Sequence, residues 1–529
     1  RETLGQFEQA KNFGSLIVPK LRDPAETLRV VEARDFAGDL LLKEVQERVV
    51  AVLRMAEALS PKYHVVVANP PYISAKGMNE ALKKFLGANY SIAKSDVYSA
   101  FVIRNCKLSL KQGQLGFMTP FVWMFISSFE KLRNFILERE TITSLVQLEY
   151  SGFDGATVPI CIFTLENSKI DGFQGKFIRL SDFRGSAQQG PRTLEAINNP
   201  DCGWSFKINA SDFERIPGSP IAYWLGLNTL NLLTDSQRLG DFVDSKQGLA
   251  TADNNRFMRF WHEVATPNIG FGLASSATAK DSGLKWFPLN KGGQFRRWYG
   301  NHDYIINWEN NGREIRDFVD SRYPYLKGNI DYVIKDRGKY FVESVSWSDI
   351  TSGGSAFRYY PKGFLYSNTG HSAFCSTVEH RDLVLSFCNT KLCTNLVAAL
   401  NPTMHFDIGY FDQLPWPEKV KGESLSDITR DAIGLSKSDW NSYETSWDFT
   451  TLPLLSSDHR GETLADSYAT LRAHWQSMTD EMKALEEENN RIFINAYGLQ
   501  DELTSEVPIE EITLTCNPAY RYGVKGTEE

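Results

Sequence analysis

Cysteine is scarce in this sequence of 529 residues: there are seven, an odd number, and no two of them form a Cys-x-x-Cys pair. This pattern is typical of reduced thiols in the cytoplasm and argues against disulfides or structural zinc. Apolar runs long enough to cross a membrane are also missing, and no signal peptide is visible. We therefore expect a cytoplasmic protein without a membrane segment.

An excess of positive charge is missing as well, since the net charge is −8. Taken alone, this charge argues mildly against a nucleic-acid partner, although its distribution matters more than its sum. The eight histidines and seven cysteines show no metal-ligand spacing, so we expect no metal site. Hydrophobic content of 42% and aromatic content of 12% indicate a globular chain, and its length predicts roughly two to four domains.

The stretch VVVANPPYI ends a predicted strand in an unusual way. Residues 64–68 are short and β-branched, which predicts a strand buried on both faces of a parallel sheet. Pro70 and Pro71 have no N–H to give to a sheet, so the strand has to stop at Asn69. Ligands of open α/β sheets bind just beyond the carboxyl ends of strands, where Tyr72 would lie. A plain strand-terminating turn with a surface tyrosine is the alternative interpretation.

Strands alternate with helices in the first 167 residues, which predicts a mainly parallel α/β sheet in a domain over residues 1–167. A helix starts at Asp23-Pro24, because proline suits the first turn of a helix. The predicted strands are 64–68, 112–120, 142–148 and 158–165, and further predicted helices are 41–59, 96–110 and 129–139.

The rest of the chain divides into three parts by composition. Residues 168–245 are rich in Gly, Pro, Asn and Ser, which predicts a connection between domains. Residues 246–420 carry many Trp, Tyr and Gly in short β-like runs, which predicts a mixed α+β domain. Residues 421–529 are mainly helical, and we expect a long helix over 463–496 with Glu486 on its exposed side.

NPPY has companions in a fixed order further along the chain. They are SDVYSAF at 95–101, GFMTP at 116–120 with Trp123, and FDGATV at 153–158. Together these motifs resemble those of the N6-adenine amino-methyltransferases. Within the first motif, helix capping and core packing account for Asp96 and Tyr98.

The second half of the chain sharpens this resemblance. The segments LATADNNRFMRFWHEV, WFPLNKGGQFRRWYGNHDYIINWENNG and NPTMHFDIGYFDQLPWP begin at residues 249, 286 and 401. They resemble the target-recognition region of large DNA methyltransferases, in particular the PglX family of BREX phage-defence systems. The resemblance covers nearly the whole chain.

The resemblance implies a fold and an activity. The fold would be α/β, part of a doubly wound Rossmann-like methyltransferase sheet, followed by a mixed α+β target-recognition domain and C-terminal helices. The activity would be site-specific N6-adenine methylation of double-stranded DNA from S-adenosyl-L-methionine, on a base flipped out of the duplex. The family also implies a role in marking host DNA as self, with other BREX proteins as partners. Acidic DNA-mimicking phage inhibitors would be further ligands of a basic cleft.

Site roles carry over to five residues. The side-chain oxygen of Asn69 and the carbonyl of Pro70 would accept the two amino hydrogens of adenine, which aims the nitrogen lone pair at the methyl group. Tyr72 would stack on one face of the flipped base, and Phe153 would cover the other face. Pro71, with Asn69, would line the methionine end of the cofactor. For Phe153, a core position before a strand is the alternative.

One element of the family pattern is missing. Family members hold the cofactor with a Gly-rich loop after the first strand and an acidic residue after the second, both well upstream of NPPY. Only 68 residues precede Asn69 here, and none of them forms such a loop. We therefore expect a C-terminal portion that is inactive on its own. Two alternatives stay open: a DNA-recognition or docking module without catalysis of its own, and the methyltransferase part of a type IIG restriction enzyme.

Positive charge concentrates in residues 285–340, which hold 11 basic and 7 acidic residues. Basic side chains can neutralise phosphates or bind guanine edges, asparagine can bind adenine, and glycine lets a backbone approach closely. A solvated basic hairpin is the alternative. The predicted DNA-binding residues are Lys291, Gly292, Gly293, Arg296, Arg297, Trp298, Tyr299, Asn301, Thr251 and Asn254, with Asp253, Arg256 and residues 352–355 as weaker candidates.

Overall fold

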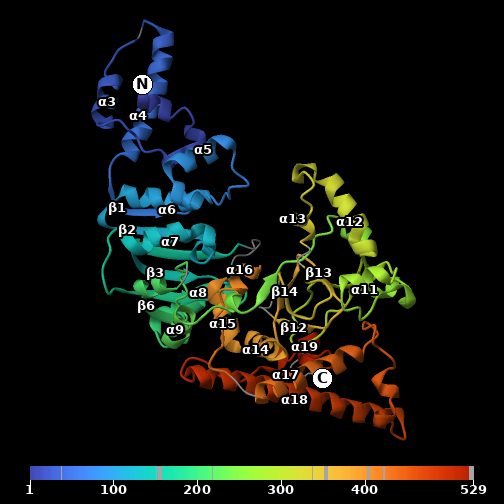
Figure 1. Ribbon diagram of the computed structural model, residues 1–529. Coiled ribbons are helices and arrows are strands. Elements are labelled where there is room, and N and C mark those ends of the chain that lie inside the picture. Colours follow the sequence, from blue (N-terminus) through green and yellow to red (C-terminus); the bar gives the residue numbers. More distant parts are fainter. Residues whose placement is uncertain are drawn as a thin grey trace. The chain divides into compact units, whose positions relative to one another are not determined.

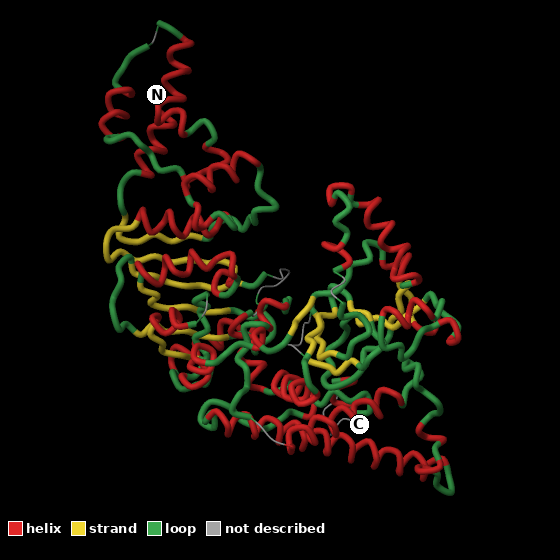
Figure 2. Tube along the Cα trace, in the orientation of Figure 1, coloured by secondary structure: helices red, strands yellow, loops and turns green. Residues whose placement is uncertain are grey.

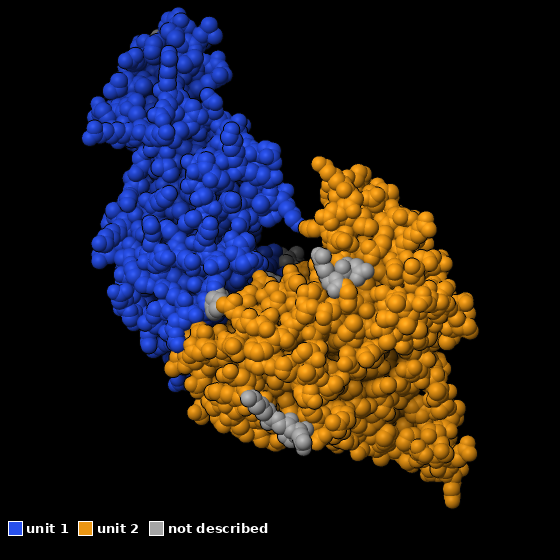
Figure 3. Space-filling view, in the orientation of Figure 1, with its two compact units in different colours: residues 1–224 blue, residues 225–529 orange. Residues whose placement is uncertain are grey.

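The structure is a computed structural model that describes residues 1–36, 38–150, 152, 158–216, 218–335, 338–350, 356–401, 405–420 and 423–523. The chain divides into two compact units, Arg1–Trp224 and Leu225–Glu529 (Figure 3). Within the described ranges, no single helix has the length and apolarity of a membrane span. One bent pair, Val378–Cys388 with Lys391–Leu400, passes that test by length and composition only.

Unit 1 is built on one six-stranded sheet with the order β1-β2-β4-β3-β5-β6, seen as a single layer of strands in Figure 2. The strands are β1 (Tyr63–Ala68), β2 (Ser109–Pro120), β3 (Thr141–Gln147), β4 (Ile160–Glu166), β5 (Gln174–Arg179) and β6 (Ser205–Asn209). The pairs β1–β2 and β3–β5 are parallel, whereas β4 is antiparallel to β2 and β3, and β6 to β5. The α/β class is confirmed. The expectation of a mainly parallel sheet is corrected, because β4 returns beside β3 and fills the place next to β2.

The helices of unit 1 begin at the residues that the sequence favours. They are α1 (Glu2–Gln6), α2 (Ala10–Phe13), α3 (Pro24–Glu32), α4 (Leu40–Leu59), α5 (Glu80–Asn89), α6 (Val97–Leu108), α7 (Glu130–Arg139) and α8 (Ser186–Asn198). Asp23, Asp39 and Asp96 cap α3, α4 and α6 by accepting backbone N–H groups of the first turn. The helices predicted at 41–59, 96–110 and 129–139 are therefore confirmed to within two residues.

Alternating side chains divide the sheet into two apolar faces. One face carries Phe117, Leu145, Phe163 and Phe177, which share a core with residues of α5, α6 and α7. The opposite face carries Ile160 and Ile178, which pack in a smaller core with Ala196 of α8. Figure 1 shows α6 and α7 running along the sheet beside β1, β2 and β3. The sheet is thus fully covered on one face and partly covered on the other.

Strand β1 is an edge strand of this sheet, and it is less buried than the sequence predicts. Val65 and Val67 are 60% and 77% exposed, and Ile162 of β4 is 42% exposed on the same face. Val66 and Ala68 point the other way and pack on the main core. The expectation of burial on both faces is therefore wrong for β1. No described element of unit 1 packs over this part of the second face.

The expected connection at 168–245 is largely part of unit 1. β5 and β6 extend the sheet beyond β3, and α8 covers its second face. Gly175 of β5 sits where an added Cβ would lie 2.5 Å from the carbonyl of Ile142, so the strand needs a residue without a side chain there. Glycine in this segment therefore marks close strand packing, and the unit boundary falls at Trp224 and Leu225.

Unit 2 contains two four-stranded sheets, ordered β13-β9-β10-β8 and β12-β11-β14-β7. Their strands are β7 (Asp244–Lys246), β8 (Met258–Phe260), β9 (Trp286–Asn290), β10 (Tyr304–Asn307), β11 (Ser344–Ser348), β12 (Phe357–Tyr360), β13 (Leu365–Tyr366) and β14 (Gly370–Phe374). The helices are α9 (Leu227–Asp235), α10 (Asn254–Phe257), α11 (Ser276–Asp281), α12 (Glu309–Arg322), α13 (Asp331–Ile334), α14 (Val378–Cys388), α15 (Lys391–Leu400), α16 (Ile408–Phe411), α17 (Glu423–Asn441), α18 (Leu464–Tyr497) and α19 (Pro518–Tyr522).

The long helix α18 confirms the predicted 463–496 helix, and its cap is Thr463. The expected exposure of Glu486 is wrong, because this carboxylate is buried in unit 2. It accepts hydrogen bonds from Arg297 and from the indole N–H of Trp298. The strand-rich part and the helical part of unit 2 are therefore joined by a buried polar contact, and they form one compact unit.

Candidate active site and nucleic-acid interface

The NPPY turn lies at the carboxyl end of β1, on the edge of the unit 1 sheet. Asn69 follows directly after β1 and is exposed, as are Pro71 and Tyr72, whereas Pro70 is buried. Within the described ranges, no donor reaches the carbonyl oxygen of Pro70. The turn therefore presents an accessible amide side chain beside an unpaired backbone acceptor, which are the two groups predicted to bind an amino group.

Tyr72 is held at this turn by its hydroxyl and its ring. The hydroxyl donates toward Asn69 Oδ1 at 2.8 Å and toward the carbonyl of Met118 in β2 at 3.1 Å. Its ring meets that of Tyr98 edge to face, with centroids 6.1 Å apart, and 38% of the residue stays exposed. Burial raises the pKa of the Tyr72 phenol, with a smaller contribution from Cys161, so the hydroxyl remains protonated at neutral pH.

Asp96 fastens the turn to helix α6. Its Oδ1 accepts the backbone N–H of Ile73 at 3.1 Å and that of Tyr98 at 3.2 Å. In return, the N–H of Val97 donates to the carbonyl of Ile73 at 3.1 Å. Burial raises the pKa of the Asp96 carboxyl, and the N–H groups of Tyr98, Ile73 and Val97 oppose that rise. Asp96 is thus a helix cap, as predicted, and also a positioning residue for the turn.

We expect Asp96→Ala to lower the free energy of unfolding by about 1 kcal/mol, through the lost cap. In the full-length protein it should also lower kcat of the methylation that the resemblance implies by about 10-fold to 100-fold, because a turn displaced by about 1 Å no longer aligns the reacting groups. Methylation rates and urea unfolding measure the two effects. Asp39→Ala is the matched control, since it removes a similar cap from α4 away from the turn. Equal rates for the two variants would contradict a positioning role, and Asp96→Asn, which keeps an acceptor, should recover most of the rate.

Phe153, the predicted second stacking residue, lies outside the described residues, as do residues 352–355. Its role therefore stays a prediction. Cys161, which contributes to the electrostatics around Tyr72, is buried in β4. All seven cysteines are free thiols in the structure. Among the described residues, no group of three or more His, Cys, Asp or Glu side chains could hold a metal ion.

S-adenosyl-L-methionine fits the described residues only in part. Asn69 and Pro71 are exposed beside the acceptors for the amino group and can form one wall of its site. In the part of the chain that the structure describes, no strand leads into a Gly-rich turn that opens a helix, the arrangement that binds such cofactors. The groups that would hold the remainder of the cofactor are therefore not found among these residues.

Most of the predicted DNA-binding segment is buried. Arg297 donates to Glu486 at 2.7 Å and to Glu511 at 3.2 Å, and Arg296 donates to the carbonyl of Thr513 at 3.2 Å. Trp298 is fully buried. The expectation that these three side chains contact DNA is contradicted by their burial and by these internal hydrogen bonds; in this trio, Nε of Arg296 is buried without a partner among the described residues.

Four more of the predicted contacts have internal roles. Tyr299 and Asn301 are buried, and Asn301 donates to the carbonyl of Gln294 at 2.9 Å. Gly292 has a φ of +78°, and an added Cβ would lie 2.7 Å from the carbonyl of Thr369. Gly293 packs in the same way on the side chain of Asn301. Packing of the loop accounts for all four residues, so the expectation of DNA contact is corrected here too.

Three predicted residues come together around a separate hollow in unit 2. Thr251 is buried and donates from Oγ1 to Asn254 Oδ1 at 2.6 Å, while Asn254 is exposed. Asn254 and Lys291 line a hollow of about 620 Å³. The other cationic and aromatic lining residues of this hollow, Arg259, Phe260 and Tyr304, are not among the residues predicted from the sequence. The run MRFWH within 249–264 combines rings and basic groups, which is a sequence signal for Arg259 and Phe260.

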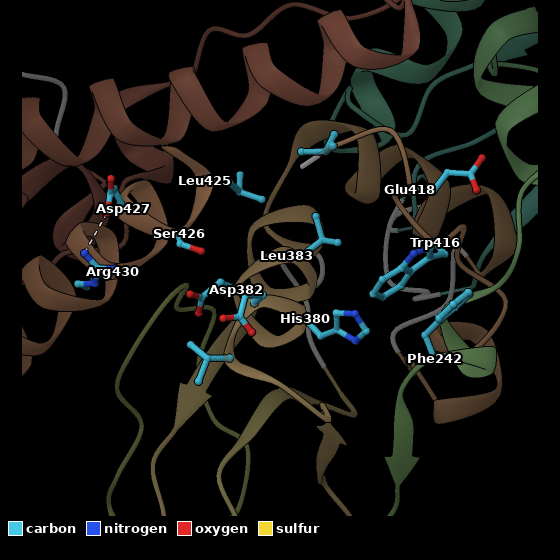
Figure 4. A pocket seen from close by; sticks show the side chains of 13 residues that line it. Phe242, His380, Asp382, Leu383, Trp416, Glu418, Leu425, Ser426, Asp427 and Arg430 are labelled. Atoms are coloured by element: carbon cyan, nitrogen blue, oxygen red, sulfur yellow. Dashed lines mark hydrogen bonds and ion pairs between the residues drawn. The ribbon is translucent and has the colours of Figure 1, made fainter. Parts of the chain in front are cut away.

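A larger hollow of about 850 Å³ lies elsewhere in unit 2 and has a different character (Figure 4). Trp416 stacks on Phe242 with centroids 4.5 Å apart, and the imidazole of His380 meets the same indole at 5.1 Å. Its charged lining consists of Glu379, Asp382, Glu418 and Asp427 against Arg430. Because carboxylates predominate, this hollow repels phosphate, and it is a poor candidate for the nucleic-acid interface.

The sheet places this chain in the α/β class, and residues 29–153 match the family described as Eco57I restriction-modification methylase. Along nearly its whole length the chain is similar to two adenine-specific methyltransferases, PglX and BrxX. It is 35% identical to the adenine-specific methyltransferase PglX of Lacticaseibacillus casei (strain Zhang), over 97% of this chain and 43% of that protein. It is 32% identical to the adenine-specific methyltransferase BrxX of Escherichia coli O9:H4 (strain HS), over 100% of this chain and 42% of that protein.

The resemblance to PglX that the sequence indicates is thereby confirmed, and the chain spans about two fifths of the length of these relatives. Among solved structures, the type IIL restriction-modification enzyme MmeI in complex with DNA aligns with a TM-score of 0.49 and 11% identity. That alignment covers 84% of this chain and 58% of that one.

Proposed function

We propose that this chain supplies the base-binding side of the active site of a site-specific DNA N6-adenine methyltransferase. The observation that carries the proposal is the exposed turn after β1, where the side chain of Asn69, the carbonyl of Pro70 and the ring of Tyr72 stand together. Two relatives that match nearly the whole chain are named adenine-specific methyltransferases, which supports adenine as the substrate.

The chemistry of the turn follows from the weakness of the nucleophile. The lone pair of adenine N6 is delocalised into the ring, so the amino group has to be polarised before it can attack. Asn69 Oδ1 and the Pro70 carbonyl accept its two hydrogens and draw the nitrogen toward tetrahedral geometry. This is electrostatic stabilisation combined with positioning, and no general base is needed beforehand. Asn69 Oδ1 has two lone pairs, so it can keep the hydrogen bond from Tyr72 while it binds the base.

An adenine inside a duplex cannot reach this turn, so the base has to be flipped out. Tyr72 offers an exposed ring face on which the flipped base stacks. The contact of its hydroxyl with the carbonyl of Met118 keeps the ring beside β2. The ring is therefore already restrained, and less rotational freedom is lost when a base stacks on it. Tyr98 supports the ring from its edge.

S-adenosyl-L-methionine supplies the methyl group when it is bound. Asn69 and Pro71 would form one wall of its site, and polypeptide that packs on the open side of β1 would supply the rest. The exposed valines Val65 and Val67 and the exposed Ile162 support such packing, because they leave an uncovered apolar surface directly behind the turn. The unpaired edge of β1 offers backbone groups for a further strand.

The setting that the resemblance implies completes the proposal. The protein would act in the cytoplasm, mark host DNA as self in BREX phage defence and work with other BREX proteins. Acidic DNA-mimicking phage inhibitors remain predicted ligands of its DNA-binding surface. Such capture would weaken at high salt, because it depends on charge.

The test of the proposal is methylation of duplex DNA by the full-length protein carrying substitutions at Tyr72. We expect Tyr72→Ala to lower kcat/KM about 10-fold to 100-fold, because base–aromatic stacking contributes about 1–3 kcal/mol. Tyr72→Phe keeps the ring and loses only the hydroxyl, so its loss should stay within about 10-fold. Tyr63→Ala at the opposite end of β1 is the matched control. Full activity of Tyr72→Ala would exclude this mode of base binding.

A docking module without catalysis of its own is the second candidate. It is favoured by one observation, namely that the described residues lack the groups for most of the cofactor. Calorimetry of this chain with S-adenosyl-L-methionine tests this second candidate. Tight binding by this chain alone would contradict the docking module, whereas no binding, together with binding by the full-length protein, would place the remaining cofactor groups in other polypeptide.

A further inference from the structure

The hollow of about 620 Å³ in unit 2 has the chemistry of a surface that reads DNA bases. Six residues matter for its lining: Asn254, Asn255, Arg259, Phe260, Lys291 and Tyr304. Its charged groups are Arg259 and Lys291 against Glu263, an excess of positive charge in a chain of net charge −8. This balance is the opposite of that in the larger, acid-lined hollow.

The side-chain amide of Asn254 has a fixed orientation that suits a bidentate hydrogen-bonding contact. The hydroxyl of the buried Thr251 donates to Asn254 Oδ1 at 2.6 Å, which fixes the plane of the exposed amide. The neighbouring Asp253 caps α10 by accepting the N–H of Arg256 at 3.1 Å, so the backbone at Asn254 is fixed as well. An asparagine amide with one free donor group and a second oxygen lone pair matches the N7 and N6 groups of adenine in the major groove.

Lys291, like Arg259, is a cation of this hollow without an acidic partner among the described residues; Arg259 donates instead to the carbonyls of Asn255 and Met258. Lys291 follows directly after β9 and is partly buried, and within the described ranges no carboxylate lies within ion-pair distance of its ammonium group. Burial lowers the pKa of this ammonium group, because it disfavours the charged form. An anion that enters the hollow would stabilise that charged form. A phosphate of the DNA backbone is such an anion.

An aromatic row forms the apolar wall. Phe260 stacks on Tyr304 with ring centroids 4.8 Å apart and on His262 at 5.5 Å, and 43% of Phe260 is exposed. Phe260 and Tyr304 are cross-strand partners in β8 and β10, which fixes the row on the sheet. An exposed ring beside a polar amide suits an A·T base pair, since the 5-methyl group of thymine makes apolar contacts in the same groove.

We infer that this hollow reads an A·T base pair of the target duplex, with Asn254 on the adenine edge, Phe260 against the thymine methyl group and Lys291 on an adjacent phosphate. Thr251 acts through Asn254 as a positioning residue. The inference rests on the proposed function, and it assigns to it residues that determine the target sequence. The recognised base pair is part of the site and is distinct from the flipped adenine at Asn69.

The first experiment needs no methyl transfer. The full-length protein selects duplexes from a randomised DNA pool, and sequencing of the bound fraction gives its consensus. We expect Asn254→Ala to lose the preference for A·T at one position, with a loss of about 10-fold to 100-fold in affinity for the consensus duplex. Thr251→Val, which removes only the hydroxyl, should show the same change to a smaller extent. Asn268→Ala, an exposed asparagine of the same unit outside the hollow, should leave the consensus unchanged.

Lys291→Met gives a different signature. It should weaken binding to all duplexes alike and reduce the slope of log affinity against log salt by about one, as for the loss of one phosphate contact. Lys280→Met on α11 is the matched control for charge. Unchanged consensus and salt slope in Asn254→Ala and Lys291→Met would overturn the inference.

The methylation assay separates this inference from the proposed function. If wild-type protein methylates a consensus that Asn254→Ala and Thr251→Val leave unaltered, the inference fails and the proposed catalysis stands. If wild-type protein binds a consensus that depends on Asn254 but transfers no methyl group, the inference stands and the proposed catalysis fails.

Discussion

Asn69→Ala in the full-length protein is expected to lower kcat for adenine methylation about 100-fold to 1000-fold, with little change in affinity for duplex DNA. Removal of a single preorganised hydrogen-bonding group at a reacting centre has an effect of this size. The amide oxygen of Asn69 is the side-chain acceptor proposed to bind the amino group, and it lies 2.8 Å from the hydroxyl oxygen of Tyr72. The variant therefore loses both the acceptor for the amino group and a support of the stacking ring.

Single-turnover methylation and fluorescence anisotropy with the same duplex separate the rate from the affinity. Asn89→Ala, on the exposed end of α5, is the control, and its rate should equal that of the wild type. Asn69→Asp keeps an acceptor oxygen, so we expect it to lose less than Asn69→Ala. A methylation rate within a few-fold of wild type for Asn69→Ala would remove the basis of the proposed mechanism.

Short-range features of the chain could be predicted from the sequence, because their causes lie within a few residues. The start of α3 after Asp23 and the end of β1 at Ala68 follow from a cap and from two prolines. The accessibility of Asn69 and Tyr72 follows from the same prolines, since a turn after a strand end lies at the sheet margin. The candidate active site was therefore visible in the sequence, apart from Phe153, which lies outside the described residues.

Burial depends on neighbours that are distant in sequence, and here the predictions failed. The run of valines in β1 is typical of a strand that is covered on both faces. Whether a face is covered, however, depends on which elements pack against it. Arg297 lies in a basic, aromatic segment of the kind that contacts DNA. Its partner Glu486, however, is 189 residues away in the sequence. A basic segment alone does not show whether its charges are already paired.

The position of Glu486 did carry a local signal. Met482, Glu486 and Phe493 stand four and seven residues apart on α18, which places them along one face of the helix. Met482 and Phe493 are buried, so a carboxylate between them has to be buried too and needs a cation. The prediction of an exposed Glu486 followed the run of three glutamates at 486–488. The spacing of the apolar residues along the helix would instead have predicted a buried acid there and a buried arginine elsewhere.

The second large effect follows from this buried pair. Arg297→Met is expected to lower the free energy of unfolding of unit 2 by about 3–5 kcal/mol, because it leaves the buried carboxylate of Glu486 without its cation. Hydrogen exchange of amides in α18, followed by mass spectrometry under native conditions, measures the change. Arg313→Met removes the exposed pair with Asp317 in the same unit and should cost at most about 1 kcal/mol.

The double variant Arg297→Met with Glu486→Leu decides between a structural role and a DNA-binding role for Arg297. Removal of both charges relieves the unpaired carboxylate, so part of the lost stability should return. The return is incomplete, because the indole N–H of Trp298 then lacks the acceptor that it has at 2.9 Å. At temperatures where it is folded, this variant should bind duplex DNA as the wild type does, with the same salt slope. A salt slope reduced by about one, together with unchanged stability of Arg297→Met, would instead identify Arg297 as a phosphate contact.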